Sequence, residues 1–304
     1  MGTPDFSVPS LRALHEGGHK VLAVVTQPDR KKGRGRKLAP PPVKRTAVQC
    51  GYPVLQPETV STDAFRRHMA ELAPDLFIVV AFGQILPQSL LDIPAIGSIN
   101  VHASLLPRYR GAAPIQWAII NGDHETGVTT MMMDKGMDTG DILLMEKTDI
   151  GPDETAADLH DRLSDMGART LVRTLEKLQN GGLERVPQDH EQATYAPMLK
   201  KKDGEIDWSM PAERIECLIR GVTPWPGAYT FSDDMRLKIF KASVLEREIS
   251  VPPGTILECF AGELRVATGK SAIAIQEIQG ESGKRLAIDD FLCGCGLPDG
   301  TCLG

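Results

Sequence analysis

Several motifs that mark common enzyme classes are missing from this 304-residue sequence. It has no G-x-G-x-x-G fingerprint, so nothing supports a bound dinucleotide cofactor. It also lacks the G-x-x-x-x-G-K-[ST] pattern, which excludes a P-loop, and the G-x-S-x-G nucleophile elbow. Any chemistry of this chain must therefore come from another arrangement of side chains.

Long apolar runs are absent as well. No stretch reaches the roughly 18–20 residues that a helix needs to cross a bilayer. The N-terminus shows no signal-peptide pattern. The composition, 41% hydrophobic and 24% charged, is close to the globular average, and the length allows two domains. We expect a two-domain protein in the cytoplasm.

Cysteines are few, and their spacing predicts no metal site. The six are Cys50, Cys217, Cys259, Cys293, Cys295 and Cys302. The last three form a C-x-C and a distant third, without the second C-x-x-C or the histidines of a zinc site. Reduced thiols are favoured, since a cytoplasmic chain of this size needs no disulfides.

Positive charge is concentrated in one segment. The net charge is −6, yet residues 30–45 hold eight basic residues and no acid, so the rest carries −14 (−6 minus 8). The eight are Arg30, Lys31, Lys32, Arg34, Arg36, Lys37, Lys44 and Arg45. Such a run is either a solvated loop or a phosphate contact, and taken alone it favours neither.

Apolar runs alternate with helical patterns in the first part of the chain. We expect strands at 21–26, 76–82, 98–102 and 129–133, and helices at 8–16, 61–72, 113–121 and 155–180. Strands that are apolar on both faces and alternate with helices indicate a parallel sheet covered by helices. Residues 1–181 are therefore predicted to form a Rossmann-like α/β domain.

The pattern changes after residue 181. Residues 182–200 are polar and contain two prolines, as in a linker. A helix near 211–220 and short runs at 228–231, 236–241, 255–260, 263–267 and 272–278 follow. Short strands bounded by turn residues predict a small OB-like β-barrel domain over residues 201–304.

The segment Gly2-Thr3-Pro4 has the composition of a turn between a strand and a helix, yet no strand precedes it. Either the start lies upstream or the sheet lacks a central strand. The second option would leave backbone groups unpaired, at about 1–3 kcal/mol for each buried group. We therefore expect an upstream start.

Asn100 and His102 lie two residues apart on the strand expected at 98–102, so their side chains share a face. Open α/β sheets bind ligands at the carboxyl ends of strands. An amide can donate to an oxyanion, and an imidazole can exchange a proton near neutral pH. A lone histidine on a strand is more often structural, so the pair needs further support.

Three acids, Asp134, Asp138 and Asp141, share a glycine-rich loop after the strand expected at 129–133. An acid near His102 would favour the protonated imidazole. The alternatives are an ordinary turn and a site for a hard cation, although the calcium-loop pattern is missing. We expect no metal.

Five segments together resemble the folate-dependent formyltransferases. They are Gly2–Phe6, Ala81–Pro87, Asn100–Pro107, Arg110–Pro114 and Met137–Asp141. The combination of Asn-x-His-x-Ser-Leu-Leu-Pro with Asp-Thr-Gly-Asp is highly specific, and the resemblance runs from residue 2 to about residue 292. It implies a catalytic trio of Asn100, His102 and Asp138.

The resemblance also implies the co-substrate, 10-formyltetrahydrofolate, and where it binds. The folate site would contain Ser104, Leu105, Leu106 and Pro107, and the pterin pocket would be lined by Gln84, Ile85 and Leu86.

Within that family, the basic segment resembles the insertion loop of members that formylate methionine on initiator methionyl-tRNA. This implies contact of Arg34, Arg36 and Lys37 with the acceptor stem, and a role in translation initiation. The alternative is a sister enzyme acting on a small amine, such as an amino sugar or glycinamide nucleotide. Such an enzyme has no use for the basic loop at 30–45. We expect a monomer.

Overall fold

The computed structural model describes residues 1–33, 35, 37–260, 262–281, 283–294 and 296–304, which form two compact units. Unit 1 comprises Met1–Gly111, Thr126–Thr148 and His160–Ala196. Unit 2 comprises Ala112–Glu125, Asp149–Leu159 and Pro197–Gly304. Within the described ranges, every helix is too short or too polar to traverse a bilayer.

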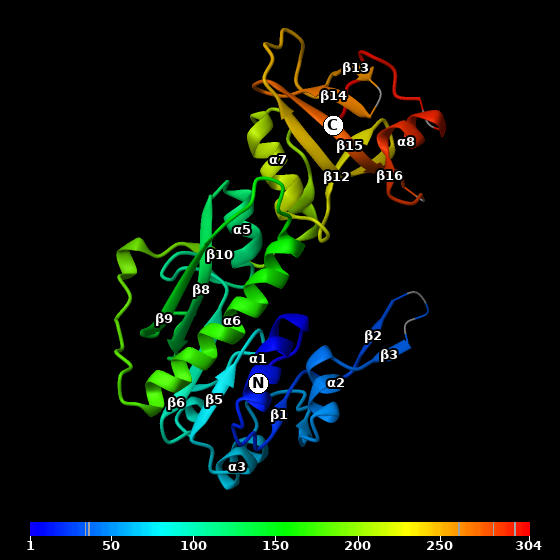
Figure 1. Ribbon diagram of the computed structural model, residues 1–304. Coiled ribbons are helices and arrows are strands. Elements are labelled where there is room, and N and C mark those ends of the chain that lie inside the picture. The colour runs from blue at the N-terminus through cyan, green and yellow to red at the C-terminus, as the bar shows by residue number, and fades with distance from the viewer. Residues whose placement is uncertain (34, 36, 261, 282, 295) are drawn as a thin grey trace. The chain divides into compact units, whose positions relative to one another are not determined.

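A four-stranded sheet forms the centre of unit 1 (Figure 1). Its order is β5 (Leu76–Val79), β6 (Gly97–His102), β8 (Glu125–Met132) and β9 (Ile142–Asp149). β5 and β6 are parallel, as predicted, whereas β8 runs antiparallel to β6. β6 therefore has a partner on each side, and Ile99 and Val101 in its middle are buried.

A second parallel pair consists of β1 (Val24–Val25) and β4 (Val54–Leu55). Met1 and Gly2 connect this pair to the main sheet. The Gly2 N–H donates to Val25 O at 3.0 Å, and the Val80 N–H donates to Met1 O at 2.9 Å. The first two residues thus take the place of the last residues of a parallel strand between β1 and β5.

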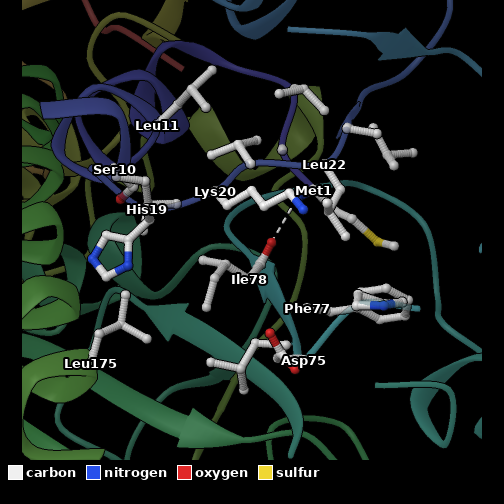
Figure 2. Close-up of a pocket in the computed structure, with 18 of the residues that line it drawn as sticks. Met1, Ser10, Leu11, His19, Lys20, Leu22, Asp75, Phe77, Ile78 and Leu175 are labelled. Atoms are coloured by element: carbon white, nitrogen blue, oxygen red, sulfur yellow. Dashed lines mark hydrogen bonds between the residues drawn. The ribbon is translucent and has the colours of Figure 1, made fainter. Parts of the chain in front are cut away.

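A cavity of about 890 Å³ opens beside Met1, between the segments 18–25 and 72–80 (Figure 2). Apolar side chains such as Leu22, Phe77 and Leu175 line much of it. The Met1 amine donates to Ile78 O at 2.6 Å, and burial lowers the pKa of this amine from 8.0 to about 5. Among the described residues, only Met1 and Gly2 occupy the place of the central strand that the turn composition predicted.

Five α-helices of the described chain have residues in unit 1. They are α1 (Val8–Glu16), α2 (Pro42–Gln49), α3 (Asp63–Glu71), α4 (Gln88–Leu91) and α6 (Ala156–Gln179), of which α6 begins in unit 2. α6 begins with a capping box: the Thr155 hydroxyl and N–H donate to Asp158 Oδ2 at 2.6 and 3.0 Å. These hydrogen bonds lower the pKa of Asp158. The apolar stripe of α6 is buried, with Leu163 and Leu171 inaccessible.

The basic segment forms a hairpin, and the chain after α6 stays with unit 1. β2 (Arg30–Lys32) and β3 (Lys37–Ala39) pair antiparallel and project from the body of unit 1 (Figure 1). Further along, β10 (Tyr195–Ala196) pairs parallel with β7 (Arg110–Gly111). Residues 182–196 of the predicted linker therefore lie in unit 1. The predicted domain boundaries stay predictions.

Unit 2 contains α5 (Pro114–Ile120), α7 (Ala212–Gly221) and α8 (Ile288–Gly294) with one antiparallel sheet. The strands are β11 (Ala228–Ser232), β12 (Met235–Leu245), β13 (Ile256–Phe260), β14 (Glu263–Ala267), β15 (Ala272–Gln279) and β16 (Leu286–Ala287). Their order is β11-β12-β15-β14-β13, with β16 beside β15, and the described strands leave its two ends unjoined. The predicted barrel is thus a half-barrel.

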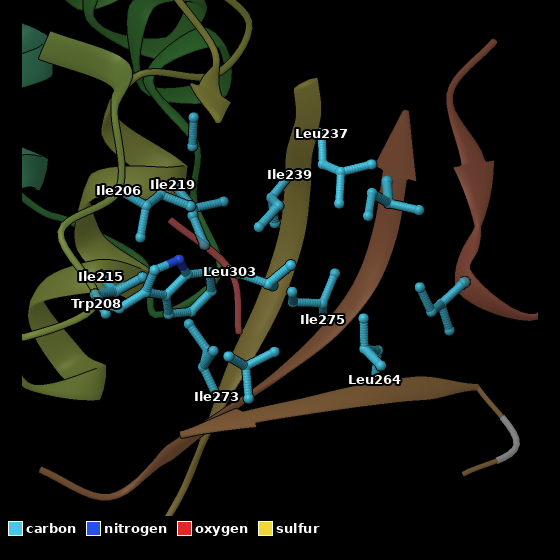
Figure 3. Packing of buried hydrophobic residues seen from close by; sticks show 14 of the residues in the cluster. Ile206, Trp208, Ile215, Ile219, Leu237, Ile239, Leu264, Ile273, Ile275 and Leu303 are labelled. Atoms are coloured by element: carbon cyan, nitrogen blue, oxygen red, sulfur yellow. The ribbon is translucent and has the colours of Figure 1, made fainter. Parts of the chain in front are cut away.

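One apolar cluster holds unit 2 together. Ile215 and Ile219 of α7 face Leu237, Ile239 and Ile275 on the sheet (Figure 3). Trp208 lies in the same cluster, and its Nε1 donates to Thr230 Oγ1 at 2.9 Å. The apolar faces of α7 and of the sheet bury one another, so the helix and the sheet form two packed layers.

Candidate active site

Asn100 and His102 lie at the carboxyl end of β6, the buried strand of unit 1. Period-two alternation places both side chains on one face, as predicted. Asn100 is half-buried, and within the described part of the chain its side-chain amide has no hydrogen-bond partner. The NH₂ group is therefore free to donate to a bound oxygen.

His102 is held by one nitrogen and faces an acid with the other. Its Nε2 lies 2.9 Å from Tyr109 O, and its Nδ1 lies 3.7 Å from Asp138 Oδ2. Because a carbonyl oxygen only accepts, Nε2 carries a proton and donates it. The Nδ1 contact is longer than a hydrogen bond, so Asp138 acts on His102 through its charge. Nδ1 is thus the nitrogen available for proton exchange.

Asp138 belongs to a loop with a constrained backbone. Its φ of 55° lies in the left-handed region, where a residue other than glycine is held only by its surroundings. Its Oδ2 accepts from the Gly111 N–H at 2.8 Å. At Gly140, an added Cβ would lie 1.8 Å from Met132 O, so this position requires glycine. Asp138 is therefore fixed in front of His102.

Two buried residues that the sequence did not single out support this loop. Gln188 Nε2 donates to Asp138 O at 2.9 Å and to Gly140 O at 2.7 Å. Gln188 Oε1 accepts from Arg110 Nε at 3.1 Å and from Arg110 Nη2 at 2.7 Å. Arg110 lies within a segment quoted for the resemblance, whereas Gln188 lies in a polar stretch that carries no such signal.

The residues predicted for folate binding differ in what they expose. Ser104 and Leu106 are buried, while Leu105 and Pro107 are half-buried. Ser104 Oγ donates to Arg108 O at 2.6 Å, and the Leu106 N–H donates to Thr129 Oγ1 at 3.2 Å. Ser104 and Leu106 thus shape the segment, and Leu105 and Pro107 present more of their surface.

The second predicted folate segment divides in the same way. Gln84 Oε1 accepts from the Val60 N–H at 2.9 Å, so its amide organises the preceding loop. Leu86 is buried in the apolar core of unit 1, and Ile85 is 89% exposed. Of the three, Ile85 is the side chain that a ligand can reach most readily.

Of the predicted tRNA residues, Lys37 lies on the β2–β3 hairpin. Arg34 and Arg36 fall outside the described residues, and Lys37 is exposed on β3. Lys44 is paired with Asp29 at 2.8 Å, so its charge is compensated locally. Exposed positive charge at the described part of the hairpin therefore includes Lys37.

A second cavity, of about 420 Å³, lies at the base of this hairpin. Arg30 and Lys31 line one part of it, and Phe82 and Gly83 line another. The hairpin base is thus next to the segment that leads into Gln84. Two regions that the sequence assigned to different ligands are neighbours within unit 1.

No metal centre is apparent in the part of the chain that the structure describes. There, no group of three or more His, Cys, Asp or Glu side chains is placed to hold an ion. Cys217 is buried, and burial raises the pKa of its thiol. Of the other candidate thiols, Cys295 lies outside the described residues.

Comparison with known proteins shows the family to which the chain belongs. Residues 1–175 match the formyl transferase family, and residues 198–296 match the formyl transferase C-terminal domain. The chain is 56% identical over 304 residues to methionyl-tRNA formyltransferase of Geobacter metallireducens, covering all of this chain and 97% of that protein. It is 53% identical to that of Caldanaerobacter subterraneus, covering all of this chain and 98% of the relative.

A solved structure has the same fold at low identity. It is an N-formyltransferase from Helicobacter canadensis in complex with folinic acid and dTDP-3-aminofucose. The TM-score is 0.70 at 20% identity, covering 92% of this chain and 97% of that one. At this identity the likeness concerns the fold alone.

Proposed function

The chain belongs to the formyl transferase family, and we propose that it transfers a formyl group from 10-formyltetrahydrofolate to the α-amino group of methionine on initiator methionyl-tRNA. Full-length relatives at more than half identity carry that activity in their names. The small-amine alternative is supported only by structures of about 20% identity. The basic hairpin, which a small amine does not need, also favours tRNA.

One observation carries the chemical part of the proposal. Asn100, His102 and Asp138 converge at the carboxyl end of β6, where an α/β sheet binds its ligand. During transfer the formyl oxygen gains negative charge. The Asn100 amide and the Nδ1–H of a protonated His102 are the donors that stabilise it.

The protons and bonds of the reaction balance without a covalent enzyme intermediate. The bond between the formyl carbon and the methionine nitrogen forms, and the bond from that carbon to the folate nitrogen breaks. The proton lost by the amine ends on the folate nitrogen. Asp138 lies 3.7 Å from His102 Nδ1 and stabilises the imidazolium, so this pair can carry the proton.

The substrate sites are proposed on exposure and charge. Leu105, Pro107 and Ile85 present surface to the folate, while Ser104, Leu106, Gln84 and Leu86 hold the two segments in shape. For the tRNA, we propose that Arg34, Arg36 and Lys37 contact acceptor-stem phosphates; the positive charge of segment 30–45 and the exposure of Lys37 support this contact.

The wider assignment follows from the reaction. Translation initiation takes place in the cytoplasm, and we place the protein there as a monomer. We propose residues 1–181 as the catalytic domain, residues 182–200 as the connecting segment, of which 182–196 belong to unit 1, and residues 201–304 as the half-barrel domain. The reaction requires no metal.

Transfer of radiolabelled formyl from 10-formyltetrahydrofolate to methionyl-initiator tRNA tests the proposal. Asn100→Ala should lower kcat by about 10²–10³-fold with little change in folate binding, because one oxyanion donor is lost. Asn100→Asp is the matched control, since it keeps the size and removes the NH₂ donor. Near-normal turnover by both variants would overturn the role of Asn100. Transfer to an amino-sugar nucleotide but not to the tRNA would favour the sister activity.

A further inference from the structure

Four hydrogen bonds join Gln188 to nitrogen and oxygen partners, and each has a defined direction; a fifth, longer contact runs from its Nε2 to Met131 Sδ at 3.9 Å. Arg110 has only donors, so the side-chain oxygen of Gln188 must face it. Asp138 O and Gly140 O only accept, so the side-chain nitrogen must face the loop. The amide can be satisfied in one orientation only. At this position a glutamate of the same size would turn a carboxylate oxygen toward two carbonyl oxygens.

The partners of Gln188 lead directly to the two titratable groups of the site. The neighbour of Arg110, Gly111, donates its N–H to Asp138 Oδ2 at 2.8 Å. On the other side of Arg110, Tyr109 O accepts from His102 Nε2 at 2.9 Å. The run 109–111 therefore contacts both His102 and Asp138. Gln188 connects the Arg110 side chain to the backbone of the Asp138 loop by hydrogen bonds.

The contact between Arg110 and Gln188, which we call the anchor, is buried, so water cannot readily replace either partner. Arg110 is 2% exposed and Gln188 is 6% exposed. Arg110 Nη2 also lies 3.1 Å from His190 Nδ1, which must accept from it. A buried guanidinium without acceptors is strongly unfavourable. These partners fix the orientation of both side chains. A left-handed backbone such as that of Asp138, with φ of 55°, persists only where surrounding contacts hold it.

We propose that Gln188, with Arg110, is a positioning residue that sets the distance between His102 and Asp138. This rests on the proposed function, in which that pair carries the proton. Gln188 touches neither substrate nor the reacting atoms, and acts by holding the Asp138 backbone. Loss of the anchor lets the loop shift, and displacement of about 1 Å at a reacting group can cost about 10²-fold in rate.

Formyl transfer by Gln188→Glu and Gln188→Leu tests the role. We expect kcat to fall by about 10–100-fold while KM for 10-formyltetrahydrofolate stays within about twofold, because the anchor does not contact the folate. The acid limb of the kcat–pH profile should shift as well. Gln192→Leu is the matched control: Gln192 is exposed and lies in the same segment, and its Nε2 donates to Asp189 Oδ2 at 2.7 Å, away from the Asp138 loop. It should retain wild-type kinetics.

A second measurement separates this proposal from the proposed function. The NMR signals of the His102 imidazole in the isotope-labelled full chain, which report its surroundings, should shift in Gln188→Leu and stay unchanged in Gln192→Leu. If the wild type transfers no formyl group but this shift occurs, the function fails and the positioning role stands. Unchanged His102 imidazole signals and unchanged kcat in a folded Gln188→Leu would overturn the positioning role.

Discussion

The buried amine of Met1 predicts that this chain loses stability as the pH falls from 8 to 5. Burial lowers the pKa of the amine from 8.0 to about 5 in the folded chain. Between these values the unfolded chain binds the proton and the folded chain does not. The free energy of unfolding therefore rises with pH in this window and is lost on acidification.

The size of the effect follows from the shift. Because the pKa falls from 8.0 to about 5 on folding, the free energy of unfolding is lower than at pH above 8 by about 1.4 kcal/mol at pH 7 and by about 4 kcal/mol at pH 5. A Gly/Ser extension of five residues before Met1 replaces the amine with an amide and carries the charge away. Its unfolding free energy should therefore depend less on pH by about those amounts.

The cavity adds a second, separable contribution. An extension of the same length rich in valine and isoleucine can enter the 890 Å³ space and pair with β1 and β5. Each buried side chain contributes about 1.5–3 kcal/mol, offset by about 1.5 kcal/mol per residue for ordering. The apolar extension should therefore be more stable than the Gly/Ser extension at every pH.

Urea unfolding of the three chains between pH 5 and 8.5 measures both effects. Other titrating groups cancel when the chains are compared with one another. Parallel pH profiles for the unextended chain and the Gly/Ser extension would refute the buried-amine argument. Equal stability of the two extensions would refute the claim that the cavity accepts a strand.

Two further predictions concern tRNA binding and helix capping. Replacing Arg34 and Arg36 with Ala should weaken methionyl-tRNA binding and reduce the slope of log K against log salt by about two. Filter binding at salt concentrations from about 50 to about 200 mM measures this slope. An unchanged slope would count against the contact. Asp158→Ala removes the partner of Thr155 and should lower the unfolding free energy by about 0.5–2 kcal/mol in urea titrations, whereas Asp165→Ala, on the exposed side of α6, should have little effect.

The sequence predicted secondary structure well where the local pattern determines it. The helix expected at 8–16 matches α1, and the helix expected at 155–180 lies within one residue of α6 at each end. The strand expected at 21–26 shrinks to Val24–Val25. Residues 21–23 line the cavity, and no strand among the described residues pairs with them. Apolar alternation predicts a buried extended segment, but pairing depends on a partner elsewhere in the chain.

The candidate site divides along the same line. Asn100 and His102 were candidates from their spacing on one strand, and the trio with Asp138 was implied by the resemblance of two motifs. Gln188 could not be found from the sequence, because it reaches Asp138 across 50 residues from a polar segment with the composition of a linker. Its role depends on tertiary contacts that no local pattern encodes. Likewise, the resemblance implied folate contacts for Ser104 and Leu106, but it gave no sign that both side chains are buried.

Burial explains why the His102–Asp138 pair needs so many supports. Their side chains are 7% and 17% exposed, so water does little to screen the Asp138 carboxylate, and its attraction for a protonated His102 across 3.7 Å is stronger than at the surface. The same burial makes an unsupported carboxylate costly. The Gly111 N–H offsets this cost at Oδ2, and the anchored backbone keeps the carboxylate facing Nδ1. A site of this kind reaches its electrostatic strength only because its carboxylate is fixed before the substrate arrives.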